Sequence, residues 1–81
     1  MRLRSVLARN LRRLRWERSL SQEELAARAG LNRNYIGMLE REESAASVDV
    51  LERLAEALAV DPTEFLSRDE ASGSQSAAPA N

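Results

Sequence analysis

The segment of residues 22–40, QEELAARAGLNRNYIGMLE, most constrains the fold, because it predicts two short helices joined by a tight turn. Ser21 and Glu24 have the spacing of a capping box, in which each side chain accepts a hydrogen bond from the other residue's backbone N–H. Gly30 lies where this first helix must end, because glycine adopts left-handed backbone angles at little cost. The two helices are therefore short and meet at a glycine turn.

A second helix is predicted after the turn, from residue 33 to about residue 41, with Asn32 as its N-cap. It buries Ile36 and Leu39, and its other side presents Arg33, Asn34, Gly37, Met38 and Arg41. An arginine can grip guanine, and an asparagine can grip adenine, through paired hydrogen bonds. The two helices form a helix-turn-helix, and this polar side favours DNA binding over a plain helical hairpin inside a bundle.

Size and composition exclude several classes of protein. Eighty-one residues allow one small domain. The chain has no cysteine and no histidine, so it lacks a zinc-finger ligand set and the commonest general base. We therefore predict no metal site, no cofactor and no enzyme activity. No apolar run is long enough to span a membrane, and the start lacks a secretory pattern, so we expect a cytoplasmic protein without membrane contact.

The charges are distributed unevenly along the chain, although the net charge is only −1. Residues 1–41 hold ten arginines against four glutamates, a net charge of +6, whereas residues 42–81 hold two arginines against nine acids, a net charge of −7. Such an asymmetry indicates one face suited to a polyanion such as double-stranded DNA.

Three further helices flank the motif. A helix over residues 3–18 is predicted from the inward spacing of Leu3, Leu7, Leu11 and Leu14, with Trp16 packed at the edge of this stripe. Ser47 can cap a fourth helix, and the run Asp61-Pro62-Thr63-Glu64 predicts the start of a short fifth helix. We expect one domain over residues 1–67 and a flexible C-terminal tail over residues 68–81, which is small, polar and without periodicity.

This arrangement resembles the lambda-repressor-like, Cro/CI or XRE-type family of helix-turn-helix DNA-binding domains. The resemblance covers about residues 4–66 and rests on Ser21-Gln22, Leu25-Ala26, Gly30, Tyr35-Ile36, Leu39-Glu40 and the ending LERLAEALAVDPTEFL. The run LNRNYI is similar to the recognition helix of small stand-alone regulators such as restriction-modification controller proteins. The resemblance implies an all-α, five-helix lambda-repressor-like domain with the helix-turn-helix at helices 2 and 3.

In that family arrangement the helix over residues 33–41 lies in the major groove, and the preceding helix crosses the phosphate backbone. The expected base-reading residues are Arg33, Asn34, Tyr35, Gly37 and Met38. For Tyr35 partial packing is an equal alternative, and for Gly37 an exposed backbone that approaches DNA competes with simple tolerance of a glycine. The expected phosphate contacts are Ser21, Gln22, Arg15, Arg41 and Ser47.

The resemblance also implies an architectural pair and two departures from the family. Arg15 is expected to pair with Glu40 in an exposed ion pair, which would make Arg15 mainly architectural. Ser19 and Glu42 occupy positions where the family often has glycine. Glu42 and the following Glu43 would place two carboxylates near DNA, and these should weaken binding.

One module of this size buries too little DNA to be selective alone, so we expect a homodimer on a palindromic operator. The expected dimer interface consists of Val50, Ala57, Val60, Phe65 and Leu66. The alternative is a protein-interaction module, such as an antitoxin or anti-repressor, that binds a protein partner through this apolar C-terminal face. The charge distribution distinguishes the two hypotheses, because an interaction module has no need of a positive surface around the helix-turn-helix.

Overall fold

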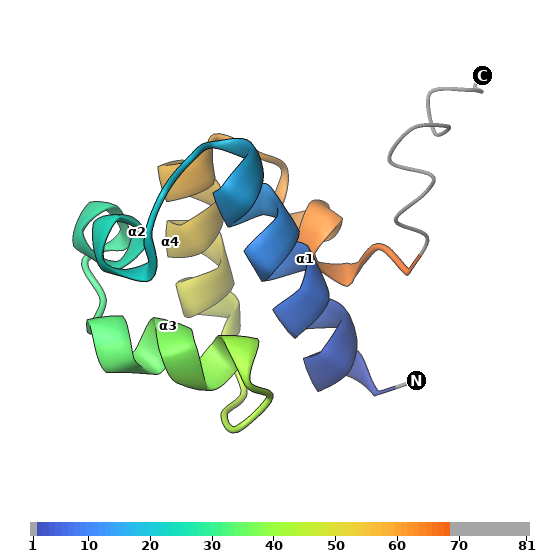
Figure 1. Cartoon of the computed structure of the whole chain (residues 1–81). Coiled ribbons are helices and arrows are strands. Elements are labelled where there is room, and N and C mark those ends of the chain that lie inside the picture. Colours follow the sequence, from blue (N-terminus) through green and yellow to red (C-terminus); the bar gives the residue numbers. More distant parts are fainter. Residues whose placement is uncertain (1, 69–81) are drawn as a thin grey trace, which may run out of the picture.

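The computed structural model describes residues 2–68, which form four α-helices and one 3₁₀ helix (Figure 1). The elements are α1 (Leu3–Glu17), α2 (Gln22–Ala29), α3 (Arg33–Glu40), α4 (Val48–Leu58) and η1 (Pro62–Leu66). The all-helical class is confirmed within these residues, but the predicted fifth helix is a 3₁₀ helix, so a count of five α-helices is not confirmed. Apart from Arg68, the tail predicted for residues 68–81 lies outside the described residues.

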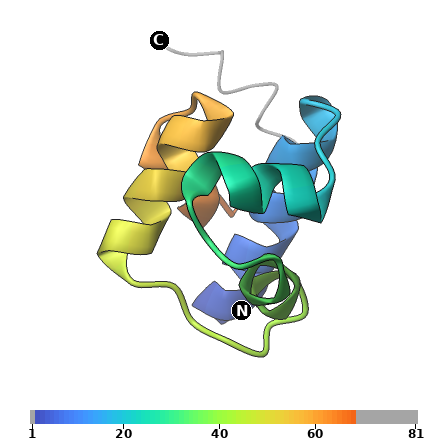
Figure 2. The same cartoon turned by 90° about the vertical axis from the view of Figure 1, so that its left-hand side faces the viewer.

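The helices pack around one apolar core. α1 contacts α3 on one side and η1 on the other, while α2 packs against α3 and α4. Figure 2 shows α2 crossing above α3, with α1 and α4 to either side of them. The largest fully buried apolar side chains are Phe65, Leu11, Leu14, Leu25, Ile36, Leu39, Leu54, Leu58 and Val6. Because α3 lies at the periphery of this core, one of its sides is left uncovered. In the part of the chain that the structure describes, no helix has the length and apolarity needed to cross a bilayer.

Each helix that follows a loop begins with the side-chain cap predicted from the sequence. The Oγ of Ser21 accepts from the N–H of Glu24 at 3.0 Å, and the Ser21 N–H donates to Oε1 of Glu24 at 2.8 Å. These hydrogen bonds from Ser21 hold the pKa of Glu24 below its usual value. The side chains of Asn32, Ser47 and Asp61 cap α3, α4 and η1, each by accepting from a backbone N–H in the first turn. The start of each of these elements is therefore fixed by local chemistry.

Each of the four α-helices is followed, one or two positions after its last residue, by a residue with left-handed backbone angles. We call these the left-handed caps: Ser19 at φ 56°, Gly30 at 69°, Glu42 at 65° and Ala59 at 59°. After each cap, the next backbone N–H donates to a carbonyl five residues earlier, as in the bond of 2.8 Å from Glu43 to Met38. Only Gly30 is a glycine, so the other three caps carry the steric strain of a Cβ.

Several expectations for α1 are wrong because neighbouring elements cover it differently from the predicted stripe. Leu3 is 56% exposed and Trp16 is 67% exposed, since neither lies beneath another helix. Val6 and Asn10 are instead fully buried, because η1 covers a second side of α1. The amide nitrogen of Asn10 donates to the carbonyls of Phe65 at 2.9 Å and Ser67 at 2.8 Å. Asn10 lies beside the leucine stripe, and the stripe alone did not indicate that this side of α1 is covered.

Candidate nucleic-acid interface

The first turn of α3 carries two polar side chains that the protein itself does not use. Arg33 and Asn34 are exposed, and within residues 2–68 neither side chain makes a hydrogen bond or an ion pair. The backbone N–H of Asn34 donates to Asn32 at 2.7 Å, which leaves its side-chain amide free. Met38 lies one turn further along and is half-buried. The first two turns of α3 therefore present a guanidinium, an amide and a thioether.

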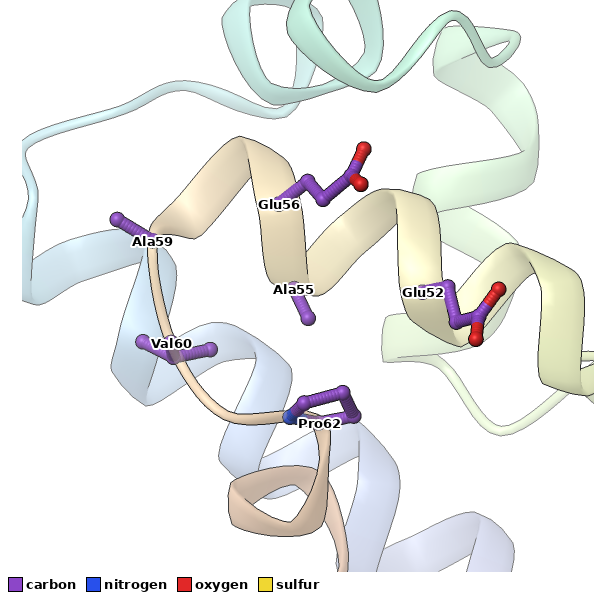
Figure 3. A pocket seen from close by; sticks show the side chains of 6 residues that line it. All are labelled: Glu52, Ala55, Glu56, Ala59, Val60 and Pro62. Carbon is purple, nitrogen blue, oxygen red and sulfur yellow. The ribbon is translucent and has the colours of Figure 1, made fainter.

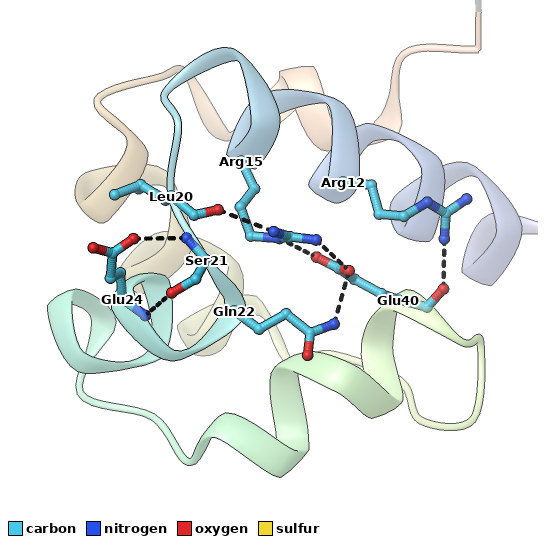
Figure 4. A network of polar contacts seen from close by, with 7 residues as sticks. All are labelled: Arg12, Arg15, Leu20, Ser21, Gln22, Glu24 and Glu40. Carbon is cyan, nitrogen blue, oxygen red and sulfur yellow. Dashed lines mark hydrogen bonds and ion pairs between the residues drawn. The ribbon is translucent and has the colours of Figure 1, made fainter.

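A buried network around Glu40 fixes how α3 sits on α1 and α2 (Figure 4). Nε and Nη2 of Arg15 donate to the two carboxylate oxygens of Glu40 at 2.7 and 2.9 Å. Nη1 of Arg15 donates to the carbonyl of Leu20, and Nε2 of Gln22 donates to Oε1 of Glu40 at 3.0 Å. Arg12 donates to the Glu40 carbonyl at 2.7 Å. Three helices thus meet at one carboxylate.

The pairing of Arg15 with Glu40 was predicted, but its expected exposure is wrong. The two side chains are only 11% and 4% exposed, because α1, α2 and α3 enclose them. Arg15 therefore has an architectural position, and its role at a phosphate stays a prediction. Arg12 also contacts the C-terminal end of α3, through its hydrogen bond to the Glu40 carbonyl. No local signal distinguishes Arg12 from the other arginines of α1.

Three of the remaining candidates for phosphate contact lie at two helix N-termini. The hydroxyls of Ser21 and Ser47 accept from backbone N–H groups, and each keeps its own proton for donation. Gln22 uses one amide hydrogen on Glu40 and retains the second. These three side chains stand at the positive ends of α2 and α4, where an anion is favoured.

Gly37 was expected on the outer surface of α3, and this placement is wrong. It is buried, and a Cβ added to it would lie 3.0 Å from Nη1 of Arg41 and 3.6 Å from Oε1 of Gln22. The guanidinium of Arg41 folds back over the glycine one turn earlier. The missing side chain thus makes room for two of the protein's own polar groups.

Both carboxylates of the loop after α3 have partners within the protein. Oε1 of Glu42 accepts from the hydroxyl of Ser5 at 2.7 Å and lies 3.6 Å from Nη2 of Arg2. The carboxylate of Glu43 accepts from Nε and Nη2 of Arg41 at 3.0 and 3.2 Å. This contact lowers the pKa of Glu43 and raises the pKa of Arg41. The loop therefore presents balanced charges, which the sequence alone did not indicate.

Tyr35 has its hydroxyl committed inside the protein. The phenolic O–H donates to the carbonyl of Ala45 at 2.8 Å, and the half-buried ring packs against the core. The hydrogen bond connects α3 to the loop that leads to α4. Of the two readings left open by the sequence, partial packing describes this conformation.

The apolar face of α4 and η1 is smaller than predicted, because Phe65 is fully buried and belongs to the core. Its assignment to a dimer interface is therefore wrong. Leu66 is 45% exposed, and Val50, Ala57 and Val60 are half-buried at the edge of the core. Beside them lies a shallow pocket lined by Glu52, Ala55, Glu56, Ala59, Val60 and Pro62 (Figure 3). This face combines small apolar side chains with two carboxylates.

Comparisons with known proteins agree with this geometry. The family model HTH_3, described as helix-turn-helix, matches residues 11–65. The chain is 41% identical over 68 residues to control protein C.SmaI of Serratia marcescens, covering 84% of this chain and 81% of that protein. The restriction-modification controller protein C.AhdI from Aeromonas hydrophila has a similar structure, with a TM-score of 0.75 and 39% identity over 76% of this chain and 94% of that chain. The hypothetical transcription factor NHTF from Neisseria superposes with a TM-score of 0.82 and 37% identity, covering 86% of this chain and 80% of that one.

Proposed function

Because this chain belongs to the HTH_3 helix-turn-helix family, we propose that it is a DNA-binding transcription regulator that reads one double-stranded sequence with α3 in the major groove. The observation that supports this reading best is the pair of Arg33 and Asn34 at the start of α3. Both are exposed and neither side chain is used within residues 2–68. Arg33 would pair with O6 and N7 of a guanine and Asn34 with N6 and N7 of an adenine.

The neighbouring helix N-termini would hold the protein in register on the phosphates. Ser21 and Gln22 begin α2, Ser47 begins α4, and each retains a hydrogen to donate. These contacts carry no sequence information themselves, and they fix the angle at which α3 enters the groove. The Glu40 network would support the same purpose, because it links α1, α2 and α3 through one carboxylate.

We further propose that two copies bind a palindromic operator whose half-sites are about 34 Å apart. The interface would form on the face of α4 and η1, with Val50, Ala57, Val60 and Leu66 at its centre. The exposed side chains of Glu52, Arg53 and Glu56 would form its polar rim. A dimer doubles the number of base contacts, which a single module of this size needs for selectivity.

Selection of bound sites from a random duplex pool tests this function. The wild-type protein is expected to enrich a two-fold-symmetric site, and Arg33→Ala is expected to lose that enrichment. Arg68→Ala makes the same change in charge two residues after η1, an element that packs against α1 and α4, so it should enrich the same site as the wild type. If the wild type enriches no sequence at low salt, the proposed function is wrong.

The protein-interaction alternative has no comparable support. None of the relatives and solved structures named above is described as an antitoxin or an anti-repressor. Equal enrichment by Arg33→Ala and the wild type would remove Arg33 from base reading without removing DNA binding.

A further inference from the structure

The end of α3 contains a cluster that the proposed base and phosphate contacts do not explain. The fork of Arg41 is occupied on one edge by Glu43, through bonds of 3.0 Å from Nε and 3.2 Å from Nη2. Its remaining nitrogen, Nη1, lies against the bare backbone of Gly37, 3.0 Å from where a Cβ would stand. Arg41 is thus held along the surface of the helix that is proposed to enter the groove.

We propose that Glu43 is an internal competitor for DNA phosphate, which holds Arg41 against Gly37 and must give up the guanidinium before Arg41 can bind the DNA backbone. The inference rests on the proposed function, because it concerns the same surface. It assigns to the acidic loop a role in setting affinity, where the sequence suggested only repulsion.

The chemistry of the two ligands makes the competition direct. A carboxylate and a phosphodiester each present two oxygens, and both match the parallel N–H groups of one guanidinium edge. Glu43 uses Nε and Nη2, the edge that a phosphate would use for the same geometry. A glutamate carboxylate is ionised at neutral pH, and the contact with Arg41 lowers the pKa of Glu43 further, so it stays a competitor.

Gly37 is the second part of this arrangement. Its missing Cβ leaves the space in which the guanidinium of Arg41 lies, within four residues on the same helix. A larger residue at position 37 would push Arg41 outward, away from the helix surface. The glycine thus permits the held conformation, and Glu43 fixes it.

The expected effect is modest, because the pair is exposed. The two side chains are 58% and 53% exposed, so water and salt screen their attraction. We expect the contact to lower affinity about two- to fivefold, for any duplex in which Arg41 meets a phosphate. Arg41 would then contribute little to the affinity for random DNA. The base contacts of Arg33 would determine which sequence the protein prefers.

A double-mutant cycle on DNA affinity tests the competition. Glu43→Gln is expected to tighten binding to a fixed duplex by several fold, because it removes the competitor and one negative charge. In the Arg41→Gln background, the same change is expected to have a markedly smaller effect, because no guanidinium remains to be released. The difference between the two effects is the coupling, with an expected value of about two- to fivefold.

Glu42→Gln is the matched control, since it makes the same charge change one residue away on a carboxylate bound to Ser5. Its effect on affinity should be equal with and without Arg41. If Glu43→Gln also acts equally in both backgrounds, the carboxylate only repels DNA through space and the competition is wrong. The thermal unfolding of the Arg41 and Glu43 variants should match that of the wild type, because neither residue is buried.

A measurement without DNA separates this inference from the proposed function. In the free protein, the Nε–H signal of Arg41 in NMR should exchange slowly with water in the wild type and in Glu42→Gln. It should exchange faster in Glu43→Gln. A signal that does not depend on Glu43 would overturn the held conformation even if the protein binds DNA. Slow exchange that depends on Glu43, in a protein that binds no duplex, would overturn the proposed function and the competition with it.

Discussion

Glu40 connects three helices through its hydrogen bonds. Its carboxylate accepts from Arg15 and Gln22, and its backbone carbonyl accepts from Arg12. A buried ion pair gains little net stability, because desolvation offsets most of the attraction. Its value lies in geometry, since the carboxylate fixes α3 relative to α1 and α2. Removal of only one partner is different, because it leaves a buried charge without compensation.

Glu40→Gln should therefore lower the free energy of unfolding by about 3 kcal/mol, because it strands the guanidinium of Arg15 in the interior. The double variant Arg15→Met/Glu40→Leu should recover most of this loss, since it removes both charges. Urea unfolding followed by far-UV circular dichroism measures both values. An unchanged unfolding free energy in Glu40→Gln would mean that the pair is solvated.

For single residues, the sequence suggested candidates for the site but did not indicate which of them already have partners within the protein. Arg33 and Arg41 look alike in the sequence, as two arginines on the outward side of one helix. The structure leaves Arg33 without a partner within residues 2–68 and pairs Arg41 with Glu43. That difference depends on the path of the chain after α3, which no periodicity encodes. Gly37 was misplaced for the same reason, because the side chain that covers it comes from the following turn.

Among the elements, the left-handed caps are the places where the chain accepts strain. A residue with a Cβ in this conformation costs about 1–2 kcal/mol, and glycine avoids this cost while losing more entropy on folding. Ser19 and Ala59 make no side-chain hydrogen bond within the described residues that would offset the strain. Glu42 differs, because its carboxylate is bound by Ser5 and approached by Arg2.

Ser19→Gly and Ala59→Gly are each expected to raise the free energy of unfolding by about 0.5–1 kcal/mol. Glu42→Gly should leave it nearly unchanged, since relief of strain is offset by loss of the contact with Ser5. Ala27→Gly, in the right-handed interior of α2, is the control and should lower stability by about 1 kcal/mol. Urea unfolding ranks the four variants, and a stabilising Ala27→Gly would contradict this account.

The boundaries of the elements could be predicted because their signals are local. Ser21, Asn32, Ser47 and Asp61 begin their helices through bonds to residues two or three positions away. The burial of Phe65 could not be predicted in the same way. Its environment is set by α1, where its hydrogen-bond partner Asn10 lies 55 residues earlier in the chain. The exposure of Leu3 could not be predicted from the sequence either, because it depends on whether another helix covers the start of α1.

For the whole molecule, the two halves of the charge distribution along the chain build different elements. The arginine-rich residues 1–41 build α1, α2 and α3, and the acidic residues that follow build the loop, α4 and η1. The proposed dimer would join acidic faces, so its apolar centre must outweigh the repulsion between carboxylates. Salt should therefore strengthen the dimer and weaken its binding to DNA.

Leu66→Asp is expected to shift the protein from dimer to monomer in analytical ultracentrifugation at micromolar concentration. Leu66 is 45% exposed, so the change should leave the fold intact. Leu3→Asp is the control, because Leu3 is also exposed but lies at the start of α1, outside the proposed interface. Phe65→Asp would be uninformative, since a charge at a fully buried position unfolds the domain. A wild-type protein that sediments as a monomer would contradict the proposed dimer.

Trp16 is the only tryptophan of the chain, and 67% of it is exposed to solvent. An indole in water emits at long wavelength whether or not the surrounding chain is folded. The intrinsic fluorescence of this protein should therefore change little when the domain melts. The same chromophore becomes useful when another molecule covers the C-terminal end of α1, because only such an event would shift its emission to the blue.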